Sequence, residues 1–223
     1  MQYSRNMGIM NDFELEKFKN TKALVVGVGG LGGYIASSLA RIGVKTITIV
    51  DFDKFDDSNL NRQLFATSKT INKDKVEIVK QELLNINPEL NIIAVNSKLD
   101  SLFDQKYFNN IDIVFDAVDN IKSKVLIEEF CFKFNIPLIH GAIAGWYGQL
   151  GIIMPGSNIL SELYKDKQQG IESVLMSPTF TPGIVGNMMI SEFVKFTLKK
   201  DALINQILYI DLLDHEYRIM YKK

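Results

Sequence analysis

Residues 23–53 constrain the fold more than any other stretch of this chain. A short apolar run at 23–26 leads into a glycine-rich loop, and a helical pattern and a second β-branched run then close on Asp51. A strand, a helix and a parallel strand in this order form a βαβ unit, and glycines at its first turn let phosphate oxygens approach the backbone. We therefore predict a Rossmann-like nucleotide-binding fold with the nucleotide at this turn.

Several positions in this unit have an expected role. Gly27 and Gly29 permit the tight turn, and Gly32 allows the helix to pack on the strand. The amino end of that helix would face the phosphates, and Asp51 would accept hydrogen bonds from ribose hydroxyls. The predicted cofactor-binding residues of the unit are Gly27, Gly29, Gly30, Gly32, Asp51 and Asp53.

The rest of the chain continues the α/β alternation, so we predict a mostly parallel sheet with helices on both faces. A polar lead-in with a short helix at 12–19 precedes the unit, and a C-terminal antiparallel hairpin ends the chain. Residues 155–181 lack periodicity and are expected to form a long surface loop, a length typical of mobile or functional loops. The predicted strands are 91–95, 111–115, 136–140, 147–154, 207–212 and 217–221, and the predicted helices are 71–87, 121–135 and 182–200.

Length and charge exclude several classes of protein. A chain of 223 residues fits one domain, and 25 basic against 26 acidic residues give a net charge of -1, which disfavours a nucleic-acid or membrane-surface partner. Cys131 is the only cysteine, so neither an internal disulfide nor a multi-cysteine zinc site is expected. Without a signal-peptide pattern or a spanning segment, we expect a cytoplasmic protein.

The polar loop after the second strand, residues 53–68, is a candidate phosphate site. Asn59 and Arg62 supply donors suited to phosphate oxygens, although a charged loop can also be merely solvated. Lys75, near the first turn of the following helix, could reach a phosphate from the same edge or remain a solvated charge.

A second acidic run, Asp-Ala-Val-Asp-Asn at 116–120, follows an apolar strand. Asp119 is a good magnesium ligand because magnesium takes hard oxygen donors and often shares them with phosphates. The alternative is that Asp119 caps the helix beginning near Ile121. Cys131, among phenylalanines, is interpreted as a packed thiol, and His140 as structural.

Together these residues resemble the ThiF/MoeB/HesA group, the bacterial relatives of ubiquitin-activating enzymes. The similarity covers nearly the whole chain and includes the glycine loop, Ser-Asn-Leu-Asn-Arg-Gln at 58–63 and Val-Asp-Asn at 118–120. The resemblance implies one adenylation domain over 1–223, with a short N-terminal arm and a mobile crossover loop around 155–181. It also implies a homodimer that uses Mg-ATP to adenylate the C-terminal glycine carboxylate of a small ubiquitin-like sulfur-carrier protein ending in Gly-Gly.

Carried over residue by residue, the resemblance implies specific roles. Asp51 would hold the ribose, and Asp119 would bind magnesium. Arg5 matches an arginine finger that enters the partner subunit's site. Asn59, Arg62 and Lys75 would hold the triphosphate. The implied catalytic residues are Arg62, Lys75, Asp119 and Arg5.

Departures from the family pattern narrow the expected chemistry. Neither Cys-x-x-Cys pair that holds structural zinc in many members is present, so we predict no zinc. The crossover region has no cysteine, so activation should stop at the acyl-adenylate and a separate sulfur donor should complete transfer. Lys124 stands near where the family often has an arginine, and its role stays open.

Other readings of the function remain. Asp51 would hold the ribose of NAD equally well in an oxidoreductase, and the missing zinc and thiol features would also suit a noncatalytic binding module. A relative that activates a tRNA base is a further possibility. Thiamine or related sulfur-cofactor biosynthesis is the expected pathway of the adenylyltransferase.

Overall fold

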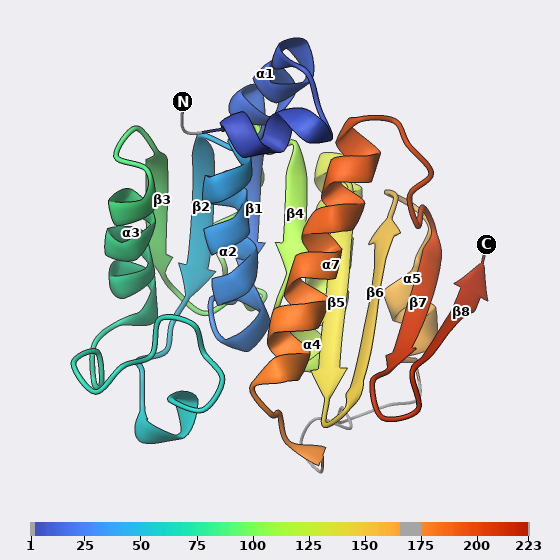
Figure 1. Ribbon diagram of the computed structural model, residues 1–223. Helices are drawn as coiled ribbons and strands as arrows, with labels where there is room; N and C mark the ends of the chain where they lie inside the picture. The colour runs from blue at the N-terminus through green and yellow to red at the C-terminus, as the bar shows by residue number, and fades with distance from the viewer. Residues whose placement is uncertain (1–2, 166–174, 223) are drawn as a thin grey trace.

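The protein is built on one eight-stranded sheet with the strand order β3-β2-β1-β4-β5-β6-β7-β8. The computed structural model in Figure 1 describes residues 3–165 and 175–222. The strands are β1 (Lys22–Val26), β2 (Thr46–Asp51), β3 (Asn91–Asn96), β4 (Ile113–Asp116), β5 (Leu138–Ala144), β6 (Tyr147–Ile153), β7 (Gln206–Asp211) and β8 (Glu216–Lys222).

The pairing divides the sheet into a parallel and an antiparallel part. The neighbours from β3 to β5 are parallel, whereas β6, β7 and β8 are added antiparallel to β5. The antiparallel part therefore starts one strand earlier than the predicted terminal hairpin. The reason is a tight turn at Gly145 and Trp146, where Gly145 has φ +56°, a conformation that suits two-residue hairpins.

Helices cover both faces of the sheet, as Figure 1 shows, and the predicted fold class is confirmed. One core forms under α2 (Gly30–Ile42), α3 (Lys75–Ile86) and α7 (Phe180–Thr197). A second core lies on the opposite face, under α4 (Ile121–Phe134), α5 (Ile159–Leu163) and the short helix η3 (Gln105–Phe108). None of the helices in the described parts of the chain has the length and apolar character needed to cross a lipid bilayer.

The N-terminal arm consists of η1 (Ser4–Gly8) and α1 (Asp12–Asn20). Asn11 and Glu14 form a reciprocal capping box that fixes the start of α1. Phe18 on this helix is fully buried and packs edge-on against Phe193, with ring centroids 5.5 Å apart. The arm lies over the amino ends of the parallel strands, at the top of Figure 1.

The segment after β6 differs from the expected surface loop. Residues 159–163 form helix α5, and both Ile159 and Leu160 are fully buried against α4 and the sheet. A helix this short gives no readable period, which is why the sequence predicted a loop there. The mobile crossover loop expected around 155–181 falls partly on 166–174, which lie outside the described residues.

The cysteine prediction is confirmed. The side chain of Cys131 is buried in the second core beside Phe130. Burial raises the pKa of its thiol far above the ordinary value, so the nucleophilic thiolate is strongly disfavoured.

Candidate nucleotide-binding site

The turn between β1 and α2 has no room for a side chain at Gly27 or at Gly32. Gly27 has φ +85°, and a Cβ there would lie 2.7 Å from the carbonyl oxygen of Ala117. A Cβ at Gly32 would overlap the carbonyl oxygen of Gly27. The N-cap residue of α2 is Gly29, and no side chain among the described residues caps the helix, so its first backbone N–H groups are available there to an anion.

Asp51, the last residue of β2, is held against this turn. Its carboxylate accepts hydrogen bonds from the backbone N–H of Val28 at 2.8 Å and from that of Asp53 at 2.9 Å. Burial raises the pKa of the Asp51 carboxyl, and the charge of Lys75 and the two backbone donors oppose this shift. The predicted ribose acceptor thus lies directly beside the glycine turn.

Lys75 reaches the same edge from the first residue of α3. Its backbone N–H donates to the carbonyl of Asp53 at 3.0 Å, and its ammonium group lies 3.1 Å from the Asp53 carboxylate. The lysine is only 6% exposed. The structure therefore brings three predicted residues together: Asp51, Asp53 and Lys75.

The loop between β2 and α3 uses several of its polar groups internally. The Arg62 guanidinium donates to the carbonyl of Ser58 at 2.8 Å and to Oδ1 of Asn61 at 3.0 Å. Asn59 is buried, and its side chain exchanges hydrogen bonds with Asp56. Asn59 thus supports the loop from within, and the direct phosphate contact implied by the resemblance stays a prediction.

The same loop lies against the glycine turn through Gln63, which the sequence interpretation left without a role. Its side-chain nitrogen would be 3.4 Å from a Cβ placed on Gly29, and Leu64 and Phe65 lie similarly close to Gly33. Within the described residues, Oε1 of Gln63 is buried without a hydrogen-bond partner. Only the folded structure could indicate this contact, because a lone glutamine carries no signal in the sequence.

Asp119 lies just beyond the loop that closes over Gly27. The backbone N–H of Ala117 donates to Val26 in β1, and its carbonyl faces Gly27. Asn120 caps α4 by accepting from the backbone N–H of Ser123 at 2.9 Å, so the alternative that Asp119 caps this helix is wrong. Asp119 itself is exposed.

Arg5 is not brought to this edge within one chain. It is exposed in η1, and its neighbours bind the far ends of the helices: Asn6 donates to the carbonyl of Arg41, and Tyr3 accepts from Asn87. Figure 1 shows this arm at the opposite end of the sheet from the loops that follow β1, β2 and β4.

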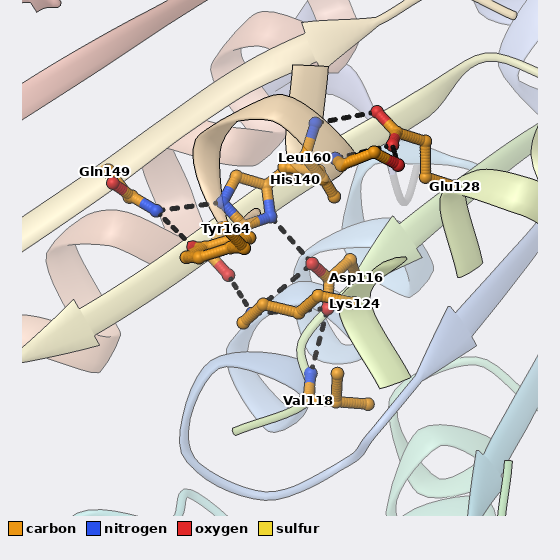
Figure 2. A network of polar contacts seen from close by, with 10 residues as sticks. Asp116, Val118, Lys124, Glu128, His140, Gln149, Leu160 and Tyr164 are labelled. Atoms are coloured by element: carbon orange, nitrogen blue, oxygen red, sulfur yellow. Dashed lines mark hydrogen bonds and ion pairs between the residues drawn. The ribbon is translucent and has the colours of Figure 1, made fainter. Parts of the chain in front are cut away.

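Behind the site lies a buried polar network that we did not predict from the sequence (Figure 2). Asp116, the last residue of β4, lies 3.3 Å from the ammonium group of Lys124 and 2.7 Å from Nδ1 of His140. Gln149 on β6 donates to Tyr164 at 2.6 Å and lies 3.1 Å from Nε2 of His140. Asp116 and His140 are 0% exposed and Lys124 is 1% exposed.

The contacts of the two ring nitrogens of His140 decide which of them carries the proton. Because the Gln149 amide donates to Nε2 of His140, the imidazole carries its proton on Nδ1 and donates it to Asp116. Burial lowers the pKa of His140, which agrees with a neutral ring. Burial alone would raise the pKa of Asp116, but Lys124 and His140 outweigh it, and the net shift of this pKa is downward.

The sequence held one indirect signal of this network. A carboxylate at the end of an otherwise apolar buried strand, β4, needs a cation or several donors. It did not reveal which distant residues supply them. His140 is buried, consistent with its interpretation as structural, and Lys124 now has a definite partner.

The donors at this edge suit magnesium with a nucleotide better than a metal held by protein alone. Within residues 3–165 and 175–222, no group of three or more His, Cys, Asp and Glu side chains could hold a metal ion. Magnesium at phosphate sites is usually bound by one or two carboxylates, with phosphate oxygens and water completing its shell. Asp119 supplies one exposed carboxylate, which fits such a site.

Comparison with known proteins identifies the family. The ThiF family matches residues 3–223. The molybdopterin-synthase adenylyltransferase of Haemophilus influenzae is 34% identical over 218 residues, 95% of this chain and 90% of the relative. The tRNA threonylcarbamoyladenosine dehydratase of Bacillus subtilis is 40% identical over 139 residues, but these are 62% of this chain and 55% of the relative.

A solved structure agrees in fold. That of E. coli MccB with ATP superposes with a TM-score of 0.84 at 21% identity, covering 99% of this chain and 71% of MccB. The predicted enzyme class, a nucleotidyltransferase, is confirmed by the adenylyltransferase relatives. With the match over nearly its whole length, the chain belongs to the ThiF family.

Proposed function

We propose that this protein is a Mg-ATP-dependent adenylyltransferase that activates the C-terminal glycine carboxylate of a small ubiquitin-like sulfur-carrier protein and releases pyrophosphate. The observation that carries the proposal is the meeting of Asp51, Asp53 and Lys75 at a glycine turn where neither Gly27 nor Gly32 has room for a side chain. Loops at the carboxyl ends of parallel strands are where such sheets bind ligands.

The reaction needs little acid–base chemistry. A C-terminal carboxyl has a pKa of about 3.5, so it is already an anion at neutral pH. One of its oxygens attacks the α-phosphorus of ATP, the bond from that phosphorus to the bridging oxygen breaks, and pyrophosphate leaves with the electron pair. The difficulty is the approach of two anions, so positioning and positive charge should supply most of the catalysis.

Different site residues would bind the ribose, the phosphates and the magnesium ion. Asp51 would orient the ribose, and the amino end of α2 would face the phosphates. Lys75 and Arg62 would neutralise the triphosphate, with Asn59 holding the Arg62 loop in shape. Asp119 would hold magnesium, which supplies further charge neutralisation at the phosphates.

The sulfur chemistry is assigned to another protein. Cys131 is buried, and burial keeps its thiol protonated, so it is unsuited to take over the activated carrier. Activation would then end at the acyl-adenylate, and a separate sulfur donor would follow. The relatives' names favour a carrier of the molybdopterin pathway over the thiamine pathway expected from the sequence.

The quaternary proposal concerns Arg5. Since η1 lies far from the nucleotide edge of its own chain, Arg5 could contribute only to the site of a second copy. A homodimer that places one arm at the neighbouring site would satisfy this requirement.

A second candidate substrate comes from the Bacillus subtilis relative. That relative is named as a dehydratase of threonylcarbamoyladenosine in tRNA, which makes a modified tRNA base the alternative substrate. The net charge of -1 gives little general attraction to a polyanion, which favours the carrier protein.

ATP–pyrophosphate exchange tests the proposal. Exchange should appear with an intact diglycine-ended carrier, and a carrier whose C-terminal carboxyl is amidated is the matched control, because it presents no nucleophilic oxygen. Absence of carrier-dependent exchange would reject the proposal. Activity with tRNA would support the second candidate, and preferential binding of NAD over ATP would support an oxidoreductase.

A further inference from the structure

Helix α4 and its N-cap carry three polar residues at four-residue intervals, and the second and third of them face the protein interior. Asn120 caps its start, Lys124 follows one turn later and Glu128 one turn after that. Residues four apart lie on the same helix face. Lys124 and Glu128 are both buried, yet they bind different parts of the molecule.

Lys124 has an acceptor for each of its ammonium protons. Its Nζ lies 3.4 and 3.3 Å from the two carboxylate oxygens of Asp116 and donates to the carbonyl of Gly141 at 2.9 Å. An ammonium group has three donors and no acceptor, so this group is fully used. The position of the Asp116 carboxylate is therefore fixed by a cation from α4.

Asp116 in turn holds the loop that carries Asp119. Its Oδ1 accepts from the backbone N–H of Val118 at 3.2 Å. The intervening Ala117 is bound to Val26 and lies on Gly27 of the nucleotide turn. The segment just before Asp119 is thus tied on one side to the turn and on the other to the buried ion pair.

The same carboxylate is tied to the segment after β6. His140 donates to Asp116, and Gln149 links His140 to Tyr164, the residue that follows α5 (Figure 2). Figure 2 also shows Glu128 directed away from this chain of contacts, toward the start of α5. There Glu128 accepts from the backbone N–H groups of Leu160 and Ser161 at 2.8 and 2.9 Å.

A stabilising role alone accounts poorly for the Lys124 contacts. Removing two charges from water costs about as much as their attraction returns, so a buried ion pair is weak evidence of a contribution to stability. What such a pair does provide is a fixed geometry. Here it fixes the loop that leads to Asp119, the candidate metal ligand.

We propose that Lys124 is a positioning residue of the nucleotide site, which acts through Asp116 to hold the 117–119 loop so that Asp119 meets the magnesium of bound Mg-ATP. The inference rests on the proposed function and assigns the role that the sequence left open. His140 is the secondary support of the same carboxylate.

The test compares nucleotide affinity with and without magnesium by isothermal titration calorimetry, using the α,β-methylene analogue of ATP. Loss of a group that orients a metal ligand typically costs about 10–100-fold in metal affinity. Lys124→Met should therefore reduce the magnesium-dependent gain in affinity by roughly tenfold or more, with affinity for the metal-free nucleotide little changed. Lys124→Arg keeps the charge and should retain most of the gain.

Glu128→Gln is the matched control. It alters a buried charged residue one turn further along the same helix, and it should lower the melting temperature without changing the magnesium-dependent gain. His140→Phe covers the case in which Lys124→Met does not fold, since it leaves the Lys124 and Asp116 pair intact. It should reduce the gain in the same direction by a smaller factor.

An unchanged gain in folded Lys124→Met, or in His140→Phe where the former does not fold, would overturn the inference. An equal loss in Glu128→Gln would do the same. If magnesium does not affect nucleotide binding by the wild type, the inference fails while carrier-dependent exchange still tests the adenylation. If exchange fails but the gain behaves as described, the proposed substrate fails and the role of Lys124 stands.

Discussion

The ammonium group of Lys75 lies 3.1 Å from a carboxylate oxygen of Asp53, and the lysine side chain is buried while that of the aspartate is half-exposed. A buried cation that loses its partner is costly, so Asp53→Asn should lower the melting temperature of the nucleotide-free protein. A bound triphosphate would supply new anionic oxygens to Lys75. ATP should therefore raise the melting temperature of Asp53→Asn by more than it raises that of the wild type.

Thermal denaturation with and without Mg-ATP measures both effects. Asp57→Asn is the control, because it removes an exposed acid from the same loop. Equal ATP-induced shifts in Asp53→Asn and the wild type would contradict a phosphate contact by Lys75.

Replacement of Arg62 should lower the rate of catalysis without affecting folding. Among the residues that the structure describes, its guanidinium bonds only within its own loop, to Ser58 and Asn61, so Arg62→Ala should leave the melting temperature nearly unchanged. Loss of a group that stabilises developing charge should lower carrier-dependent exchange by about 100–1,000-fold. Arg41→Ala removes the same charge at the far end of α2 and should keep normal exchange; a folded Arg62→Ala with near-normal rates would reject the assigned role.

The glycine turn predicts that a glycine-to-alanine substitution destabilises the protein much more at Gly32 than at Gly8. A Cβ at Gly32 would overlap the carbonyl of Gly27, whereas a Cβ at Gly8 would meet nothing within 4 Å. Gly32→Ala should reduce the free energy of unfolding by about 1–3 kcal/mol or more, because the backbone must shift. Gly8→Ala should change it little. Urea denaturation gives both values, and similar values for the two variants would show that the turn can relax.

The nucleotide edge was predictable because its signals are local. The glycines, the β-branched run and Asp51 lie within one βαβ unit, where strand and helix periods fix which residues come together. The hydrophobic pattern also placed Lys75 in the first turn of the following helix, which is confirmed, although that helix begins at Lys75 and not at residue 71. The position of Asn59 inside its loop could not be read, because side-chain capping depends on the loop conformation.

The buried network was not predictable because its members are distant in sequence. Asp116, His140 and Gln149 come from three strands, and they meet only once β4, β5 and β6 are adjacent. The partner of Lys124 is likewise set by which face of α4 packs on the sheet. Helix α5 was missed for a different reason: its five residues are too few to show a helical period in the sequence.

Acid should destabilise the protein through this network. Burial lowers the pKa of His140, so the folded ring stays neutral where the unfolded chain, with a pKa of about 6.5, takes up a proton. The unfolded state then binds more protons, and the free energy of unfolding should fall as the pH is lowered through about 6.5. The lowered pKa of Asp116 adds a further loss below about pH 4.

Urea denaturation between about pH 7.5 and pH 5 measures the first of these losses. His140→Phe should flatten the dependence in this range, and His215→Phe, in the exposed turn between β7 and β8, should leave it as in the wild type. If the free energy of unfolding of His140→Phe still falls as the pH is lowered through this range, other groups cause the acid sensitivity.

The distance of Arg5 from the nucleotide edge of its own chain predicts complementation between subunits. In a mixture of Arg5→Ala and Arg62→Ala, half of randomly assembled dimers are hybrids, and each hybrid has one site with both arginines. Exchange should then recover to about a quarter of the wild-type rate, while each variant alone stays inactive. A mixture of Arg62→Ala and Lys75→Met should not recover, because every site lacks one of two residues supplied by the same chain. If subunit mixing is demonstrated and the first mixture stays inactive, Arg5 does not act across the interface.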